Sequence, residues 1–279
     1  MCVSFAPAEF TGAIAFGGEV DKHTHLLGYE NKAQSFVGPN CMLLHVPTDE
    51  LTADSLIPTQ HAPGFMKSLG STVSSLRPAR RSMTRGGAVL RGATFVQYGA
   101  YDVLLANSAA DIPAALDQVS PAKRPALNDA LLHWYDQNFD GYSFILACFN
   151  NAIETVNHPI LVQYDPWDSS TLFVPGLESH SGSAPALGMR DHDRDFKVVF
   201  GSRHAGDYNY PRAVRYSDNL GELANLLPEY AVGFRDENYG TNSDYVAGVE
   251  DVRSGLNGQD LFKTMSQHFS GSPLERYSR

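Results

Sequence analysis

Short apolar runs separated by turn-forming residues make up the first part of the chain. Residues 3–5, 13–16, 25–29 and 41–46 are runs of this kind, and glycine, proline and asparagine residues lie between them. Runs of this length and composition are typical of β-strands that follow one another through short turns. The pattern therefore predicts a β-meander over residues 2–46.

The most continuous apolar run of the chain covers residues 142–149. A short run without alternation, bounded by turn residues, is typical of a strand that is buried on both faces. We expect this run to be a central strand, with the runs 159–164 and 171–174 as its neighbours. Further strands are expected at residues 94–98, 101–105 and 196–200.

Two helices are expected between these strands. Ser108 can cap the first, which would run to about Val119, and Ser120 followed by Pro121 can start the second. Apolar residues recur in the second helix with the helical period, so one of its faces should pack on the sheet. These residues are Leu127, Leu131, Trp134 and Tyr135. Shorter helical pieces are expected at residues 48–53, 63–69, 220–227 and 259–269.

These elements predict a single α+β domain over residues 1–228, with a mostly antiparallel sheet and two helices packed on one face. Residues 229–279 are expected to form a C-terminal extension, or arm. This region is rich in Tyr, Asn, Asp and Gly. Such a composition suits an extended aromatic contact surface, which could cover the domain or contact another subunit.

Length, charge and cysteine content narrow the class of protein. A chain of 279 residues with 43% hydrophobic residues can bury a sizeable core. It has neither an apolar run near the ~18 residues of a membrane span nor the pattern of a secretory signal, so we expect a cytoplasmic protein. The formal charge of −10 opposes general affinity for nucleic acid or anionic lipid. The dispersed Cys2, Cys41 and Cys148 predict no disulfide framework or thiolate metal site.

Cys2 directly follows the initiator methionine, and this position offers one specific chemistry. After methionine removal, residue 2 would carry a thiol and an α-amine with a pKa of about 8, which can act as general base for that thiol. Amide hydrolases with an N-terminal nucleophile also need oxyanion donors, for which Asn40 and Asn151 are candidates. A retained methionine would block the amine. The alternative interpretation of Cys2 is a small buried strand residue.

A second candidate site lies between the strands expected at 171–174 and 196–200. His180 is followed within 13 residues by Asp191, His192 and Asp193. Imidazole and carboxylate groups bind divalent metal ions, and a His–Asp pair can act as a general base. The same residues also suit a turn stabilised by side-chain hydrogen bonds. His23 and His25, which would share one face of a strand, form a weaker candidate of the same kind.

A cluster of arginines stands out in this acidic protein. Residues 71–87 contain Arg77, Arg80, Arg81 and Arg85 among Ser, Gly and Pro residues. Guanidinium groups bind phosphates, carboxylates and acidic protein surfaces. The alternative is a solvated loop whose charges offset the excess of acid.

Several segments resemble a family of uncharacterised bacterial proteins that start with Met-Cys. They are the Met1-Cys2 start, residues 38–47 (GPNCMLLHVP), residues 98–103 (YGAYDV) and residues 172–177 (LFVPGL), followed by Asp191 and His192. The resemblance covers about residues 1–200. It implies a compact α+β unit followed by a variable C-terminal region, and it implies no activity.

Three functions are compatible with these features. We favour a non-enzymatic assembly or interaction protein, without a cofactor, whose arm and arginine cluster contact another subunit or a protein partner. The first alternative is a cysteine amide hydrolase, which requires an accessible Cys2. The second is a metal-dependent hydrolase with a divalent ion, which requires the His180, Asp191, His192 and Asp193 side chains to converge within ~5 Å of one point.

Overall fold

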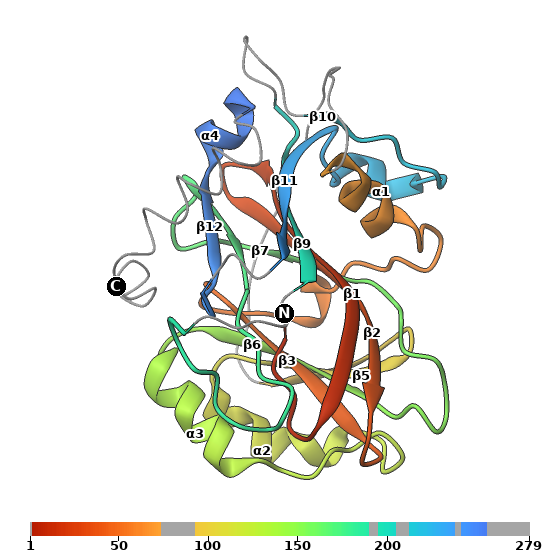
Figure 1. Ribbon diagram of the computed structural model, residues 1–279, viewed down its shortest axis with the longest axis vertical. Helices are drawn as coiled ribbons and strands as arrows, with labels where there is room; N and C mark the ends of the chain where they lie inside the picture. The colour runs from red at the N-terminus through yellow and green to blue at the C-terminus, as the bar shows by residue number, and fades with distance from the viewer. Residues whose placement is uncertain (1, 74–92, 190–194, 205–211, 238–240, 256–279) are drawn as a thin grey trace.

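The computed structural model describes residues 2–73, 93–189, 195–204, 212–237 and 241–255. In this part of the chain the backbone forms three sheets, with few helices (Figure 1). The largest sheet has six strands in the order β10-β11-β9-β1-β2-β7. The strands are β1 (Ala8–Asp21), β2 (Thr24–Ser35), β7 (Ile160–Tyr164), β9 (Asp195–Ser202), β10 (Arg212–Ala213) and β11 (Tyr230–Glu237).

A long antiparallel hairpin, β1–β2, lies inside this sheet. Its other pairings are antiparallel except for β1 with β9, which are parallel. The expected fold class, α+β with mostly antiparallel strands, is confirmed. The predicted β-meander over residues 2–46 was wrong. Within that range only β1 and β2 pair as consecutive strands, residues 3–5 form isolated bridges, and the third strand, over residues 40–46, belongs to another sheet.

A second sheet has four strands in the order β3-β6-β5-β4. They are β3 (Asn40–Val46), β4 (Thr94–Tyr98), β5 (Tyr101–Ala106) and β6 (Ser143–Phe149). Every residue of β6 is buried, as expected for the most apolar run. The neighbours expected for β6 were wrong: β6 pairs with β3 and β5, whereas β7 pairs with β2. The remaining expected neighbour, β8 (Thr171–Val174), forms a small sheet with β12 (Tyr245–Gly248).

The two sheets share an apolar core. Side chains from β1 and β2 meet side chains from β3, β5 and β6 there, among them Ala15, Leu27, Leu44, Val103 and Ile145. The opposite face of the four-stranded sheet is covered by the two helical segments between β5 and β6 (Figure 1). The first segment is a run of short turns, η2 (Ala109–Asp111), α2 (Ile112–Ala115) and η3 (Leu116–Gln118), and the second is α3 (Asp129–Asn138).

Helix α3 begins later than the sequence predicted. Its cap is Asn128, whose side chain accepts a hydrogen bond from the backbone N–H of Leu131, instead of Ser120. Leu127 consequently lies before the helix and is 41% exposed. Leu131, Leu132 and Tyr135 form the buried face of α3. An asparagine at this position satisfies a free N–H of the first turn as well as a serine would.

Smaller helical elements cover the outer face of the six-stranded sheet. Helix α1 (Phe65–Thr72) and the short η4 (Gly221–Asn225) pack there on β1, β2 and β9. The turn η1 (Ala53–Ser55) precedes α1. Within the described residues, none of the helices has the length and apolar character needed to span a membrane.

The described part of the expected C-terminal extension is built into the sheets. Strand β11 pairs with both β9 and β10, and β12 pairs with β8 before α4 (Val249–Ser254) begins. The described residues between 230 and 255 therefore belong to the same packed unit as the described residues before them. The helix expected at residues 259–269 lies outside the described residues.

Candidate functional site

Cys2 lies in the core next to the strands of the four-stranded sheet. Residues 2–4 lie between Leu43 and Ser179. Leu43 N–H donates to the Val3 carbonyl, Ser4 N–H donates to the Ser179 carbonyl, and Ser179 N–H donates to the Cys2 carbonyl. The Cys2 side chain is 2% exposed. Burial raises the pKa of its thiol to about 12, only partly offset by the N-terminal charge and the Tyr29 hydroxyl. A buried thiol with this pKa is a poor nucleophile at neutral pH.

The two asparagines predicted as oxyanion donors have a different role. Asn151 accepts a hydrogen bond from Ser35 N–H (2.7 Å) and donates one to the Ala33 carbonyl (2.8 Å). Asn40 accepts from Ala6 N–H (3.2 Å) and donates to the Ala6 carbonyl (2.9 Å). The Asn151 amide therefore binds the backbone at the end of β2, and the Asn40 amide, at the start of β3, binds the backbone of the segment before β1.

The β2–β3 turn, residues 36–39, exposes apolar side chains. Phe36 is 61% exposed and Val37 is 60% exposed. The turn is nevertheless fixed: Phe36 N–H donates to the Pro7 carbonyl, and Gly38 adopts a φ of 94°, a left-handed conformation that favours glycine. Ile153, which is 53% exposed, lies two residues after Asn151 on the neighbouring turn. Two adjacent exposed apolar side chains on a braced turn suit contact with another macromolecule.

His180 is the one residue of the predicted metal site that the structure describes. Its ring stacks at a tilt on Phe10, with 4.9 Å between ring centroids, and its Nε2 lies 4.0 Å from Glu178 Oε1. Asp191, His192 and Asp193 lie outside the described residues, as do Arg77, Arg80, Arg81 and Arg85. Among the described residues, no group of three or more His, Cys, Asp or Glu side chains is placed to hold a metal ion.

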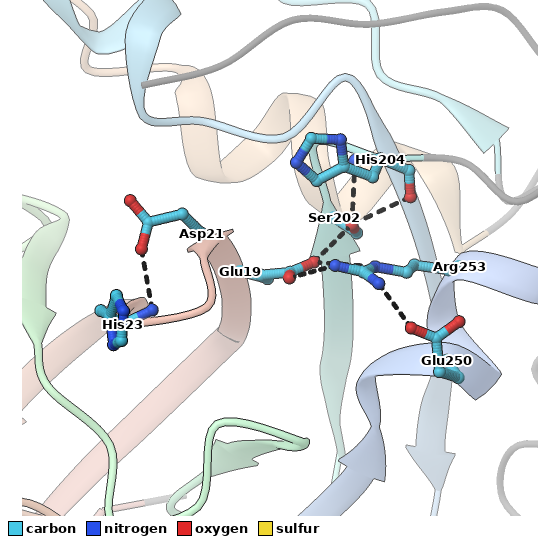
Figure 2. Close-up of polar contacts among 7 residues, drawn as sticks. All are labelled: Glu19, Asp21, His23, Ser202, His204, Glu250 and Arg253. Carbon is cyan, nitrogen blue, oxygen red and sulfur yellow. Dashed lines mark hydrogen bonds and ion pairs between the residues drawn. The ribbon is translucent and has the colours of Figure 1, made fainter. Parts of the chain in front are cut away.

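A buried polar cluster fastens the C-terminal helix to the large sheet (Figure 2). Glu19 of β1 is 2% exposed and accepts hydrogen bonds from Nε and a terminal nitrogen of Arg253 on α4. The Ser202 hydroxyl lies 2.8 Å from the same carboxylate, and Arg253 also binds Glu250. The backbone N–H of His204 donates to the Ser202 hydroxyl, which also lies 3.0 Å from the His204 carbonyl oxygen. The Ser202 hydroxyl thus contacts a carboxylate and backbone groups, which is not the arrangement of a nucleophile with its base. The Glu19–Arg253 ion pair joins α4 to β1.

His23 and His25 do not share one face. His23 is exposed in the β1–β2 turn, where its backbone N–H donates to Asp21, and His25 is fully buried in β2 opposite Glu19. Burial lowers the pKa of His25 to about 4, and nearby groups that favour its charged form, chiefly the Glu19 and Asp168 carboxylates, offset only part of this effect. His25 is therefore neutral near pH 7.

One buried His–Asp pair was not predicted from the sequence. His45 Nε2 lies 2.8 Å from Asp244 Oδ2, and Asp244 also accepts the N–H of Gly176. The His45 ring is 1% exposed and packs against aromatic rings that include Phe139 and Phe173. Because rings enclose the imidazole, this pair joins β3 to the start of β12 as a structural contact. The partners are 199 residues apart, so no local signal pointed to them.

The chain is similar to solved structures of baculovirus P35. No family model matches the sequence, and no curated protein matches it. A crystal structure of baculovirus P35 is similar with 15% identity and a TM-score of 0.43, covering 72% of this chain and 67% of P35. A mutated baculovirus P35 after caspase cleavage has 10% identity and a TM-score of 0.44, covering 86% and 98% of the two chains. The structure of the caspase-8/P35 complex matches with 14% identity and a TM-score of 0.40, covering 68% of this chain and 63% of the matched chain. These values are too low to assign a shared function.

Proposed function

We propose that this protein acts by binding a protein partner or a second copy of itself, without catalysing a reaction. The observation that carries the proposal is the β2–β3 turn, where Phe36 and Val37 are adjacent, exposed and apolar on a braced backbone. The arginine cluster and residues 256–279 of the predicted arm (229–279), which lie outside the described residues, remain sequence-based candidates for further contacts.

The energetics favour such a contact. Complete burial of a Phe or Val side chain contributes about 1.5–3 kcal/mol, so two neighbouring side chains can anchor an interface. The turn is already ordered by Asn40, Asn151 and Pro7, and this lowers the conformational entropy lost on binding. Single exposed apolar residues are common on surfaces, whereas an adjacent pair on an ordered turn is a suitable anchor.

The burial of Cys2 opposes the hydrolase alternative. Its thiol is in the core with a pKa of about 12, and the amides of Asn40 and Asn151 are bound to backbone carbonyls. A nucleophile needs both a thiolate and a path to substrate. In this conformation Cys2 has neither.

The proposal is tested with the double variant Phe36→Ser/Val37→Ser and the matched control Met189→Ser, since Met189 is 64% exposed and lies in another loop. Sedimentation velocity measures self-association, and affinity capture with quantitative mass spectrometry compares bound proteins among the three forms. We expect the wild type and the control to associate with the same partner, and the double variant to lose at least tenfold in affinity. Equal binding by all three forms, or no association of either kind, would overturn the proposal.

A further inference from the structure

Cys41 and Cys148 are direct neighbours across the β3–β6 ladder. The antiparallel register pairs Cys41 with Cys148, between the pairs Asn40–Phe149 and Met42–Ala147. Both cysteines are free thiols with 0% exposure, and both lie on the face of the sheet that the helices cover. Cys2 belongs to the other core, between the two sheets.

The hydrogen-bond pattern shows which kind of cross-strand pair this is. Leu43 donates its N–H to Val3, on the side of β3 away from β6. Backbone groups alternate in direction along a strand, so those of Cys41 also point away from β6, and Cys41 N–H binds the Asn40 side chain at 2.9 Å. Cys41 and Cys148 therefore form a non-hydrogen-bonded pair.

Non-hydrogen-bonded pairs bring side chains closest together. Their Cα atoms are about 4.5 Å apart, which lies within the range of roughly 4.4–6.8 Å that disulfide bonds occupy. Two thiols in this position need only a small approach of their Cβ atoms to form a bond. The spacing of 107 residues in the sequence gives no hint of this proximity.

We propose that Cys41 and Cys148 are a disulfide site, which closes when the protein folds in the presence of a small-molecule disulfide such as oxidised glutathione. The thiolate of one cysteine attacks a sulfur of the oxidant and releases one reduced glutathione. The second cysteine attacks the mixed disulfide and releases another. The protein loses two electrons and two protons, and the oxidant gains them.

Folding is the stage at which the bond can form. In the folded protein both thiols are out of contact with solvent, whereas during folding β3 and β6 can pair before the helices cover them. The bond would close a loop of more than a hundred residues and restrict the unfolded chain, so it should stabilise the fold.

The test is refolding of the reduced, unfolded chain in oxidised or in reduced glutathione, followed by alkylation of free thiols and peptide mapping. We expect the oxidised sample to contain a Cys41–Cys148 disulfide with Cys2 alkylated, a native circular dichroism spectrum and a higher urea midpoint than the reduced sample. Cys2→Ala is the matched control and should form the same bond, whereas Cys41→Ala and Cys148→Ala should form no intramolecular disulfide.

The wild-type protein alone is sufficient to decide the question. Three alkylated cysteines in a natively folded, oxidatively refolded sample would overturn the proposal. A disulfide that includes Cys2, or a bonded species with lower stability or a non-native spectrum, would also overturn it.

Discussion

The side chain of Asn151 is bound to the backbone of Ser35, with 2.7 Å between Asn151 Oδ1 and Ser35 N. This contact links two turns that are 116 residues apart in sequence. It fixes the backbone at the end of β2, directly before Phe36. An asparagine far away in the sequence therefore helps to fix the conformation of the turn that exposes Phe36 and Val37.

Replacement of Asn151 by Ala should destabilise the protein by about 1–3 kcal/mol, because Ser35 N–H and the Ala33 carbonyl lose their partner. Urea denaturation measures the change. Asn150→Ala is the neighbouring control, since its hydrogen bonds are exposed, and it should cost less than ~1 kcal/mol. Equal effects of the two variants would contradict the bracing role.

Arg253→Met should cost about 3–5 kcal/mol, nearer the lower value, because it leaves the buried Glu19 carboxylate without its cation while Arg253 itself is 28% exposed. Glu250→Ala removes the exposed carboxylate that binds Arg253 and should change the free energy of unfolding by less than ~1 kcal/mol. Both are measured by chemical denaturation.

A double variant makes this test specific to the ion pair. Glu19→Gln combined with Arg253→Met should be more stable than the sum of the two single changes implies, since no unpaired buried charge remains. Strict additivity would show that Glu19 and Arg253 do not interact energetically.

His25 should make stability depend on pH. Its pKa is about 4 in the folded protein and 6.5 without burial, so the unfolded chain binds a proton in the window between these values and the folded chain does not. Stability is therefore expected to fall as the pH is lowered from about 6.5 toward 4, by roughly 2–3 kcal/mol from this residue.

The measurement is the free energy of unfolding in urea at several pH values between about 4.5 and 7. His25→Gln should flatten this profile relative to the wild type. His133→Gln is the control, because His133 is exposed on α3, and it should leave the slope unchanged. The same slope in all three proteins would show that His25 is not the group responsible.

Cys2 should resist alkylation in the folded protein. With a pKa of about 12, its thiolate fraction at pH 8 is on the order of 10⁻⁴, and its side chain is buried. Iodoacetamide at pH 8 should therefore modify Cys2 at least a hundredfold more slowly in the folded state than in urea, measured by mass spectrometry of the peptides. A rapid adduct at Cys2 under native conditions would restore the hydrolase interpretation.

Local features of the sequence were enough to predict the elements and the fold class. The apolar run at residues 142–149 became the fully buried β6, and the runs 13–16, 25–29 and 41–46 lie in β1, β2 and β3, whereas residues 3–5 form only isolated bridges. These predictions succeed because strand formation follows from the side chains of a few adjacent residues. The predicted start of α3 was wrong. Two residues, Ser120 and Asn128, could cap the helix, and the sequence does not show which one does.

The partners of each element were decided by the tertiary structure alone. Strand pairing joins residues that are distant in the chain, so the apolar pattern could not show that β6 pairs with β3 and β5. The same is true of His45 with Asp244, of Glu19 with Arg253, and of Cys41 with Cys148. Whether Cys2 is a nucleophile or a core residue depends on burial, because desolvation sets the pKa of a thiol and burial is a property of the whole fold.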